Sequence, residues 1–419
     1  MNDNPSVLIG IDWADKKHDY HLIGPDGKSH TGIFLQSPEA IEEMVQKWRK
    51  VAGGAPLAIA IEATKGPLIN ALMQFGNIEI YPINPAAMAS YRKAFSHGGS
   101  KNDPVDCQLL VQYLSNYIDQ LEPLRQDQPL TRQIASLVEE RRHLVDRRAD
   151  LGNELVSVLK MYFPAILALK AAKSYAGFLL ALVAKYPTLE ATKKAGANKL
   201  RRFFNARGLR KHAESRIETL LTSRALSDDE TLLQTCSRRA VNLCEQLQLL
   251  NKLIKRAEDE LKCLIPRHPD HAIAESFPEA AVVTQARMIM AMGDDRSRFP
   301  TAESLSACSG IAPVTIQSGR MKIVRRRWAC PKFMKQTFHE YAAQSVKGGG
   351  WAKAYYDLQI SRGKPAQVAF RALAFKWQRV IHRCWLSGQP YCESTYVERL
   401  RATGSPVVAL LDQSIPKAA

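Results

Sequence analysis

The first apolar run of the chain reads Val7-Leu8-Ile9-Gly10-Ile11-Asp12 and ends on a carboxylate. Two more short apolar runs follow, Tyr20 to Ile23 and Ile33 to Leu35, and the residues Gly24-Pro25-Asp26-Gly27 between those two are a strong turn signal. Short runs of β-forming residues separated by turn residues are typical of strands joined in hairpins. The start of the chain therefore predicts three antiparallel strands.

Helical and strand patterns alternate after these hairpins. Ser37-Pro38-Glu39 combines an N-cap residue with a proline at the first helical position, so we expect a helix to begin there. Strands are expected over Leu57 to Ile61 and over Ile78 to Ile80, with a helix from about Pro67 to Phe75 between them. This succession predicts a mixed five-stranded sheet in the ribonuclease-H-like order, which actin-like sugar kinases share in outline.

Four carboxylates of this part are expected to meet in one pocket. Asp12 and Glu62 end the first and fourth strands, which are neighbours in such a sheet, about 4.8 Å apart. Asp103 and Asp106 share one face in the first turn of a later helix. Clustered carboxylates need a cation, and Mg²⁺ prefers hard oxygen ligands, so the pocket predicts a magnesium site suited to phosphodiester chemistry. In the alternative, Asp103 and Asp106 only cap the helix.

The middle of the chain is predicted to be helical. Apolar residues step by alternating four and three positions from Leu130 to Val158 and again from Cys236 to Leu264. This pattern predicts either an antiparallel helical hairpin or a coiled coil between subunits. Arg141 and Arg148 lie on the first seam, where charge weakens a tight dimer core, and we expect them to face nucleic acid instead. A helical insertion, Leu167 to Ser227, separates the two stretches.

The last part, from about Ala272, is again predicted to be mostly helical. A loop rich in glycine, proline and serine is expected from Ser309 to Gly319, and the residues beyond Gly388 carry little pattern. These patterns divide the chain into residues 1–125, 126–268, 269–390 and a tail over 391–419. The predicted fold class is α/β followed by all-α.

Positive charge is in excess and is concentrated in two runs. The 58 Lys and Arg residues outnumber the 41 Asp and Glu residues, and the net charge is +17. Lys193 to Lys211 contains eight basic residues and no acid, and Arg320 to Lys335 contains seven and no acid. Fields of one sign favour a polyanionic partner, so we expect nucleic acid to bind both runs. The candidate contacts are Lys199, Arg201, Arg202, Arg320, Lys322, Arg325, Arg326 and Arg327.

Several other classes of protein are excluded. No apolar run approaches the roughly 20 residues that span a bilayer, and the N-terminus carries no secretory signal. The eight cysteines form no CxxC pair and no zinc-like spacing, which is typical of free thiols. We therefore expect a cytosolic protein with no membrane partner.

An ordered set of motifs spans nearly the whole chain. It begins with Ile9-Gly10-Ile11-Asp12, Ile61-Glu62-Ala63-Thr64, Tyr81-Pro82-Ile83-Asn84-Pro85 and Lys101-Asn102-Asp103-Pro104-Val105-Asp106. It continues with Asp295-Arg296-Ser297-Arg298-Phe299, Ser309-Gly310-Ile311-Ala312-Pro313 and Ser318-Gly319. In this combination the chain resembles the Asp-Glu-Asp-Asp transposases of the insertion-sequence family called IS-one-ten.

The resemblance implies a RuvC-like nuclease domain over 1–125, a coiled-coil region over 126–268 and a helical transposase domain over 269–390. It implies that Asp12, Glu62, Asp103 and Asp106 bind the metal, and that Ser318 attacks DNA to form a covalent protein–DNA link. It also implies guidance by a structured bridge RNA. A homodimer would assemble to a tetramer across double-stranded donor and target DNA, in the bacterial cytosol and nucleoid.

Two segments depart from the family pattern. Ser276-Phe277-Pro278-Glu279-Ala280 lacks the usual glycines, and Arg325 to Lys332 replaces a Thr-Lys-x-Gly-Asn segment, although its arginines can still attract phosphate. Two alternatives remain open at this point. One is a metal-only RuvC-like nuclease or junction resolvase, in which Ser318 belongs to a simple Ser-Gly turn. The other is a non-catalytic nucleic-acid-binding protein.

Overall fold

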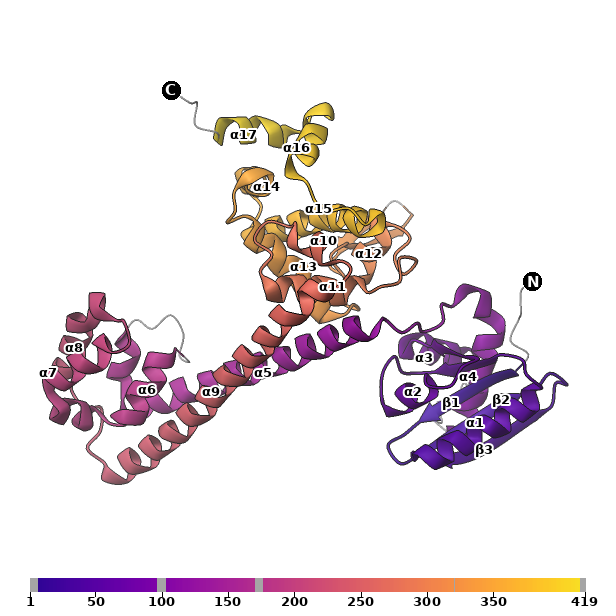
Figure 1. The fold of residues 1–419 in the computed structure, drawn as a ribbon, viewed down its shortest axis with the longest axis horizontal. Helices are drawn as coiled ribbons and strands as arrows, with labels where there is room; N and C mark the ends of the chain where they lie inside the picture. The colour runs from indigo at the N-terminus through magenta and orange to yellow at the C-terminus, as the bar shows by residue number, and fades with distance from the viewer. Residues whose placement is uncertain (1–6, 96–102, 170–175, 320, 415–419) are drawn as a thin grey trace. The chain divides into compact units, whose positions relative to one another are not determined.

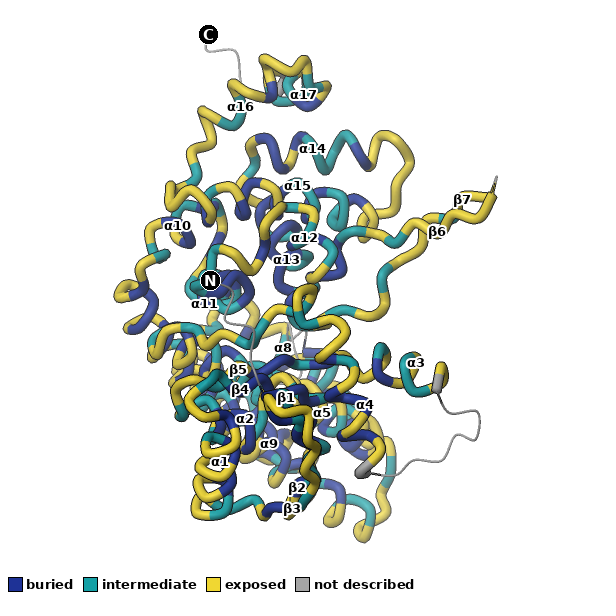
Figure 2. Tube along the Cα trace, turned by 90° about the vertical axis from the view of Figure 1, so that its right-hand side faces the viewer, coloured by how far each residue is buried: buried dark blue, intermediate teal, exposed yellow. Residues whose placement is uncertain are grey.

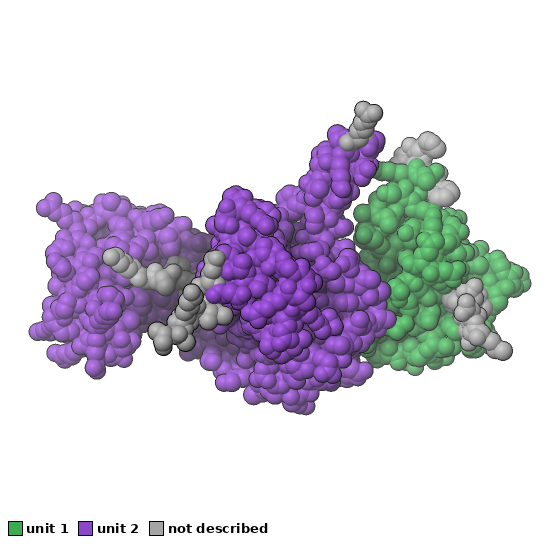
Figure 3. Space-filling view, turned by 90° about the horizontal axis from the view of Figure 1, so that it is seen from above, with its two compact units in different colours: residues 1–126 green, residues 127–419 purple. Residues whose placement is uncertain are grey.

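The computed structural model describes residues 7–95, 103–169, 176–319 and 321–414 (Figure 1). The chain divides into two compact units, Met1–Gln126 and Asp127–Ala419 (Figure 3). In the described part of the chain, no helix is both long and apolar enough to cross a lipid bilayer.

Unit 1 is built on a mixed five-stranded sheet with the strand order β3-β2-β1-β4-β5. Its strands are β1 (Val7–Trp13), β2 (Lys17–Ile23), β3 (Ser29–Leu35), β4 (Leu57–Ile61) and β5 (Ile78–Pro82). β2 is antiparallel to β1 and β3, whereas β4 is parallel to both β1 and β5. The predicted sheet, with three hairpin strands followed by two crossover strands, is confirmed.

Helices cover both faces of this sheet. One face packs against α1 (Pro38–Ala52) and α2 (Pro67–Leu72), and the other against α3 (Pro85–Phe95) and α4 (Asp103–Tyr117). The second face carries the small residues Ala58 and Ala60 of the buried strand β4. A Cβ added to Gly10 would lie 2.3 Å from the carbonyl oxygen of Cys107, so only glycine lets α4 pack this closely on β1. This close packing holds the start of α4 against the end of β1.

A long antiparallel hairpin of α5 (Pro129–Tyr162) and α9 (Glu230–Leu264) runs through unit 2 (Figure 1). Both helices bury the expected heptad residues, among them Leu155 and Val158 on α5 and Leu243 and Leu247 on α9. Of the two arrangements open to the heptads, the hairpin within one chain is confirmed. The insertion folds as α6 (Gly177–Lys185), α7 (Leu189–Asn205) and α8 (Ala213–Thr222), which share a core with one end of the hairpin.

The rest of unit 2 is a second helical body, with Trp351, Trp377, Phe338 and Tyr341 fully buried at its centre. Its helices are α10 (His271–Glu275), α11 (Val282–Met292), α12 (Ala302–Cys308), α13 (Lys332–Ser345), α14 (Gly350–Ser361), α15 (Ala366–Ser387), α16 (Glu393–Ala402) and α17 (Pro406–Ser414). Short 3-10 helices occur elsewhere, at Ile118–Gln120 in unit 1 and at Pro164–Leu169, Arg210–His212 and Ile265–Arg267 in unit 2.

Two segments of this body differ from the expectation. The predicted loop contains a hairpin of β6 (Val314–Ser318) and β7 (Met321–Arg325), which extends from the body with nearly all of its residues exposed (Figure 2). Apolar and polar residues do alternate over a few positions, at Val314 and Ile316 in β6 and at Met321 and Ile323 in β7. The surrounding glycine, proline and serine residues outweighed this short pattern and indicated a loop. Beyond Gly388, α16 and α17 are regular helices, and each buries one apolar side chain, Leu400 and Val407.

Candidate active site and nucleic-acid interface

Asp12 and Glu62 lie at the ends of adjoining strands. The parallel register pairs Ile11 with Ile61, and the residue that follows each of them along the chain is one of the two acids. Both acids are half-buried. The predicted proximity of these two residues follows directly from this register, because parallel strands carry their carboxyl ends to the same edge of a sheet.

Asp106 is brought to the same edge by α4. It is one of few buried charged residues of the described chain, with 4% of its surface exposed. Arg92 on α3 donates to it twice, from Nε at 2.9 Å and from Nη2 at 2.8 Å, both to Oδ1. The same Nη2 lies 4.0 Å from Glu62 Oε1. One guanidinium therefore joins the end of β4 to the first turns of α4.

Arg92 was not among the residues predicted from the sequence. The available signal was indirect: a buried carboxylate requires a counter-charge, and Arg92 and Lys93 are the basic residues in the last turn of α3. Sequence spacing could not identify which cation faces the acids, because the pair is 14 residues apart and joins two helices.

The thiol of Cys107 reports the negative charge of this region. Burial is the main cause that raises the pKa of Cys107 to about 12; the charges of Asp12, Asp19 and Asp106 act in the same direction, and a hydrogen bond from the Asp12 backbone acts against them. Its Sγ donates to the carbonyl oxygen of Asp19 at 3.2 Å. Three carboxylates thus act on one buried group.

The fourth predicted acid, Asp103, is the first residue of α4, but its side chain lies outside the described residues. Among the side chains that are described, no group of three His, Cys, Asp or Glu residues is close enough to hold a metal ion. Between Glu62 and Asp106 the positive charge is supplied by Arg92.

Ser318 belongs to unit 2 and ends β6 at the tip of the exposed hairpin. It pairs with Met321 across the turn, and Gly319 between them has a φ of 55°, which favours glycine. The Ser318 side chain is exposed and so is open to a large substrate. Its role as nucleophile stays a prediction.

The basic candidates fall into three groups. Lys322, Arg325 and Arg326 are exposed on the hairpin and just after it, Arg327 is half-buried, and Arg320 lies outside the described residues. On α7, Lys199 and Arg202 are exposed, whereas Arg201 forms an ion pair with Glu214 at 2.6 Å (Nε to Oε1). The third group is Arg141 and Arg148.

These last two arginines have partners across the helical hairpin. Arg141 Nη2 lies 2.7 Å from Glu258 Oε1, and Arg148 Nη1 donates to Asn251 Oδ1 at 3.0 Å. Both contacts join α5 to α9, and the arginine of the first pair has only 22% of its side chain exposed. The hairpin itself therefore accounts for charge on the seam, and contact of these arginines with nucleic acid stays a prediction.

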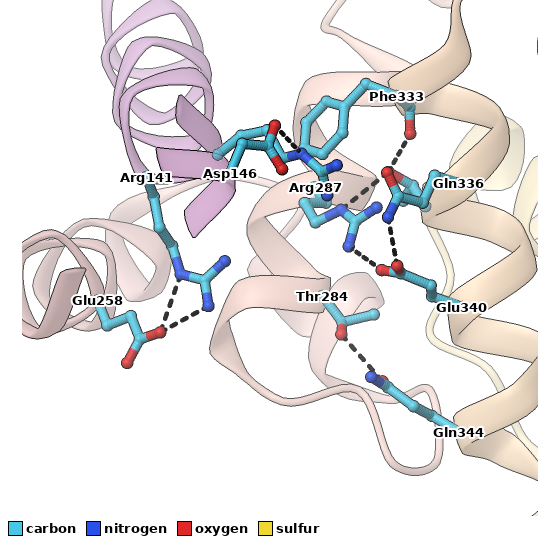
Figure 4. A network of polar contacts seen from close by, with 11 residues as sticks. Arg141, Asp146, Glu258, Thr284, Arg287, Phe333, Gln336, Glu340 and Gln344 are labelled. Atoms are coloured by element: carbon cyan, nitrogen blue, oxygen red, sulfur yellow. Dashed lines mark hydrogen bonds and ion pairs between the residues drawn. The ribbon is translucent and has the colours of Figure 1, made fainter. Parts of the chain in front are cut away.

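A polar network fixes α13, the helix in which the second basic run ends (Figure 4). Arg287 of α11 forms an ion pair with Glu340 at 2.5 Å (Nη1 to Oε2) and donates from Nε to Thr337 Oγ1 at 3.0 Å. Its guanidinium also lies 4.6 Å from the ring centroid of Phe333. Because the Arg287 side chain is only 11% exposed, these contacts are shielded from solvent and hold α13 on α11.

Comparison with known proteins places both units in one family. Residues 9–164 match the family model of the DEDD transposases of IS110. Residues 271–357 match the model of the transposase IS116/IS110/IS902 family. The chain belongs to the IS110 (IS-one-ten) family of transposases. Its activity is that of a DNA transposase. Membership of the DEDD group implies a divalent metal cofactor.

The similarity to relatives in this family extends over almost the full chain. A mini-circle protein of Streptomyces coelicolor, named as a transposase for IS117, is 27% identical over 93% of this chain and 96% of its own length. The 42 kDa protein of insertion element IS900 from Mycobacterium paratuberculosis is 23% identical over 90% of this chain and 94% of its own length. The first family match includes Asp12, Glu62, Arg92 and Asp106, and the second includes the hairpin with Ser318.

Proposed function

We propose that this IS110-family transposase cuts and rejoins DNA by attack of Ser318 on a phosphodiester, assisted by Mg²⁺ at Asp12, Glu62, Asp103 and Asp106. The observation that carries the proposal is the meeting of Glu62 and Asp106 at one guanidinium, beside the strand end that bears Asp12. A sheet edge that gathers carboxylates from three elements is the arrangement that a nuclease pocket requires.

The residues of this pocket fit a hard divalent cation. Their donors are carboxylate oxygens, which Mg²⁺ prefers, and two of the acids already face one cation, the guanidinium of Arg92. Bound Mg²⁺ would supply stabilisation for negative charge that develops on a phosphate. Arg92 would hold Glu62 and Asp106 in place, and burial of Asp106 would keep its orientation constant.

Ser318 supports the proposal by its position at an exposed tip, within a strongly basic segment. In the proposed step a bond forms between Ser318 Oγ and phosphorus while the bond from phosphorus to the 3′ oxygen breaks. The proton lost by Oγ ends on the released 3′ oxygen, and a 5′-phosphoserine remains. Rejoining is the reverse attack by a 3′ hydroxyl of another strand. Exposed Lys322 and Arg325 can steady the phosphate charge.

The partners proposed are double-stranded donor and target DNA, a structured guide RNA, and further copies of this chain in a dimer that assembles to a tetramer. The family resemblance and the exposed basic residues on α7 and the β6–β7 hairpin support this choice. DNA as substrate also supports a bacterial cytosolic location.

A covalent adduct is the direct test. The protein is incubated with Mg²⁺, DNA carrying the ends of its insertion element, and RNA transcribed from the element's non-coding flank; the mixture is then denatured and resolved by electrophoresis. We expect labelled DNA attached to protein, lost in Ser318→Ala and in Asp12→Asn. Cleavage by Ser318→Ala at the parent rate would overturn the serine mechanism and favour the metal-only nuclease.

A further inference from the structure

A basic pocket with an aromatic wall lies where the β6–β7 hairpin returns to the helical body. It has a volume of about 480 Å³, within the range of about 300–1,000 Å³ that is usual for small-ligand sites. The segment after β7 contributes Arg326 and Trp328, α13 contributes Lys332, Lys335 and His339, and α15 contributes Arg371.

The charge of this pocket is of one sign. Four of its lining residues are cations, and no carboxylate is among the described residues that line it. The next residue of α13 after His339 is the acid Glu340, whose carboxylate points to other partners. It pairs with Arg287 and accepts a hydrogen bond from Gln336, at 2.5 Å each. Lys335 is held by its bond from Nζ to the carbonyl oxygen of Arg327 at 2.8 Å. The pocket is therefore a preformed site for an anion.

Trp328 makes the pocket more than an anion site. Its side chain is 78% exposed, the largest exposure among the large hydrophobic residues of the described chain. The guanidinium of Arg326 lies 5.0 Å from its ring centroid and orients the indole. An exposed indole beside a cluster of cations is the combination on which unpaired bases stack while their phosphates are neutralised. An acidic peptide would use the cations but leave the indole face empty.

We propose that this pocket receives one unpaired nucleotide, of DNA or RNA, whose base stacks on Trp328 and whose phosphate contacts Arg326 and Arg371. The inference rests on the proposed function in one respect, that nucleic acid contacts the basic run of the hairpin, and it does not require chemistry at Ser318. A paired base within a duplex cannot reach the indole, so the pocket distinguishes unpaired from paired sites.

The test compares two labelled probes by fluorescence anisotropy with the full chain. One probe is a perfect duplex, and the other is the same duplex with a single unpaired nucleotide in its centre; both are made as DNA and as RNA. We expect Trp328→Ala to weaken binding of the bulged probe about tenfold and to leave the perfect duplex within about twofold, whereas Trp328→Phe retains the preference. Arg371→Gln should likewise weaken the bulged probe more than the duplex. The preferred backbone, DNA or RNA, identifies the source of the nucleotide.

Two exposed residues outside the pocket provide matched controls: Met321→Ala removes an apolar side chain from the hairpin, and Lys347→Gln removes a charge beyond the end of α13. Neither should change the ratio of the two affinities. Equal weakening of both probes by Trp328→Ala, or no weakening, would overturn the pocket and leave the proposed function standing. Absence of binding to any probe by the parent protein would overturn both.

Discussion

Arg92 and Asp106 form an ion pair of 2.8 Å (Nη2 to Oδ1) that joins α3 to α4 at the carboxylate edge of the sheet. Only 6% of the Asp106 side chain and 24% of the Arg92 side chain are exposed, so water screens the pair weakly. The same guanidinium reaches Glu62, and the site is therefore held together by a residue that carries the opposite charge from all of its proposed metal ligands.

Removal of Arg92 should destabilise unit 1 and leave its carboxylates to be neutralised by another cation. Arg92→Ala leaves Asp106 buried without its partner, which we expect to cost about 3 kcal/mol in the free energy of unfolding measured with urea. Millimolar Mg²⁺ should then raise the melting temperature of Arg92→Ala more than that of the parent protein, because ligand binding to the folded state stabilises it. Adding Asp12→Asn to Arg92→Ala should reduce this rescue. An equal response of all three proteins to Mg²⁺ would argue against a metal pocket at this edge.

The acids should be required for activity, and at Asp103 this requirement should be separable from folding. Glu62→Gln and Asp106→Asn keep the shape of each side chain and remove its charge, so we expect recombination to be lost. Asp103→Asn is the sharpest case, since asparagine caps a helix as well as aspartate does. We expect this variant to retain its helix content by circular dichroism and to lose strand cleavage. Recombination at the parent rate would mean that Asp103 is only a helix cap.

The Arg287–Glu340 pair should set part of the acid sensitivity of unit 2. Burial raises the pKa of Glu340, but the hydrogen bonds and charge of Arg287 outweigh it, and the net pKa lies below the ordinary 4.5. A carboxyl group with a depressed pKa contributes stability above its unfolded pKa and loses it as the pH falls through the folded value. We expect Glu340→Gln to be less stable than the parent at neutral pH by about 1 kcal/mol. The difference should shrink in urea melts as the pH falls from about 5 to 3; a constant difference would contradict this role.

Salt dependence should separate nucleic-acid contacts from structural arginines. Each phosphate neutralised on duplex DNA contributes about 0.9 to the slope of log affinity against log salt. Replacing exposed Arg325 and Arg326 together with glutamine should therefore lower that slope, measured between about 50 and 200 mM salt, and so should Lys199→Gln with Arg202→Gln. Arg141→Gln should destabilise the helical hairpin and leave the slope unchanged, because Arg141 already pairs with Glu258. A reduced slope in Arg141→Gln would instead show that Arg141 contacts a phosphate of the DNA.

Mixing two inactive proteins tests whether subunits share an active site. Ser318→Ala retains the acids, and Asp12→Asn retains the serine. If the acid pocket of one subunit works with the serine of another, mixed assemblies regain a complete site, and partial strand cleavage should return. The control is each variant alone at the same total concentration. Cleavage that stays absent in the mixture would place both parts of the site within one subunit.

Regular patterns made the layout of unit 1 and of the helical hairpin predictable. The run that ends on Asp12 and the run that ends on Glu62 are short, apolar and followed by turn or helix signals, which favours buried strands. The parallel register of β1 and β4 then brings the two acids to the same edge. The heptads predicted α5 and α9 equally well, although their period does not distinguish a partner in the same chain from one in another.

The sequence by itself determined which residues form the sheet, the heptad helices and the acidic edge, because these depend on short-range periodicity and on where apolar runs end. Only the tertiary structure decided that Arg92 joins Glu62 to Asp106, that Arg141 pairs with Glu258, and that the segment around Ser318 is an exposed hairpin. Ion pairs between elements depend on how helices pack, which leaves no fixed spacing along the chain. The apolar alternation of the hairpin covers only two residues in each strand, Val314 and Ile316 in β6 and Met321 and Ile323 in β7, which is too short to identify a strand among turn residues. The backbone hydrogen bonds that pair the two strands show the hairpin directly.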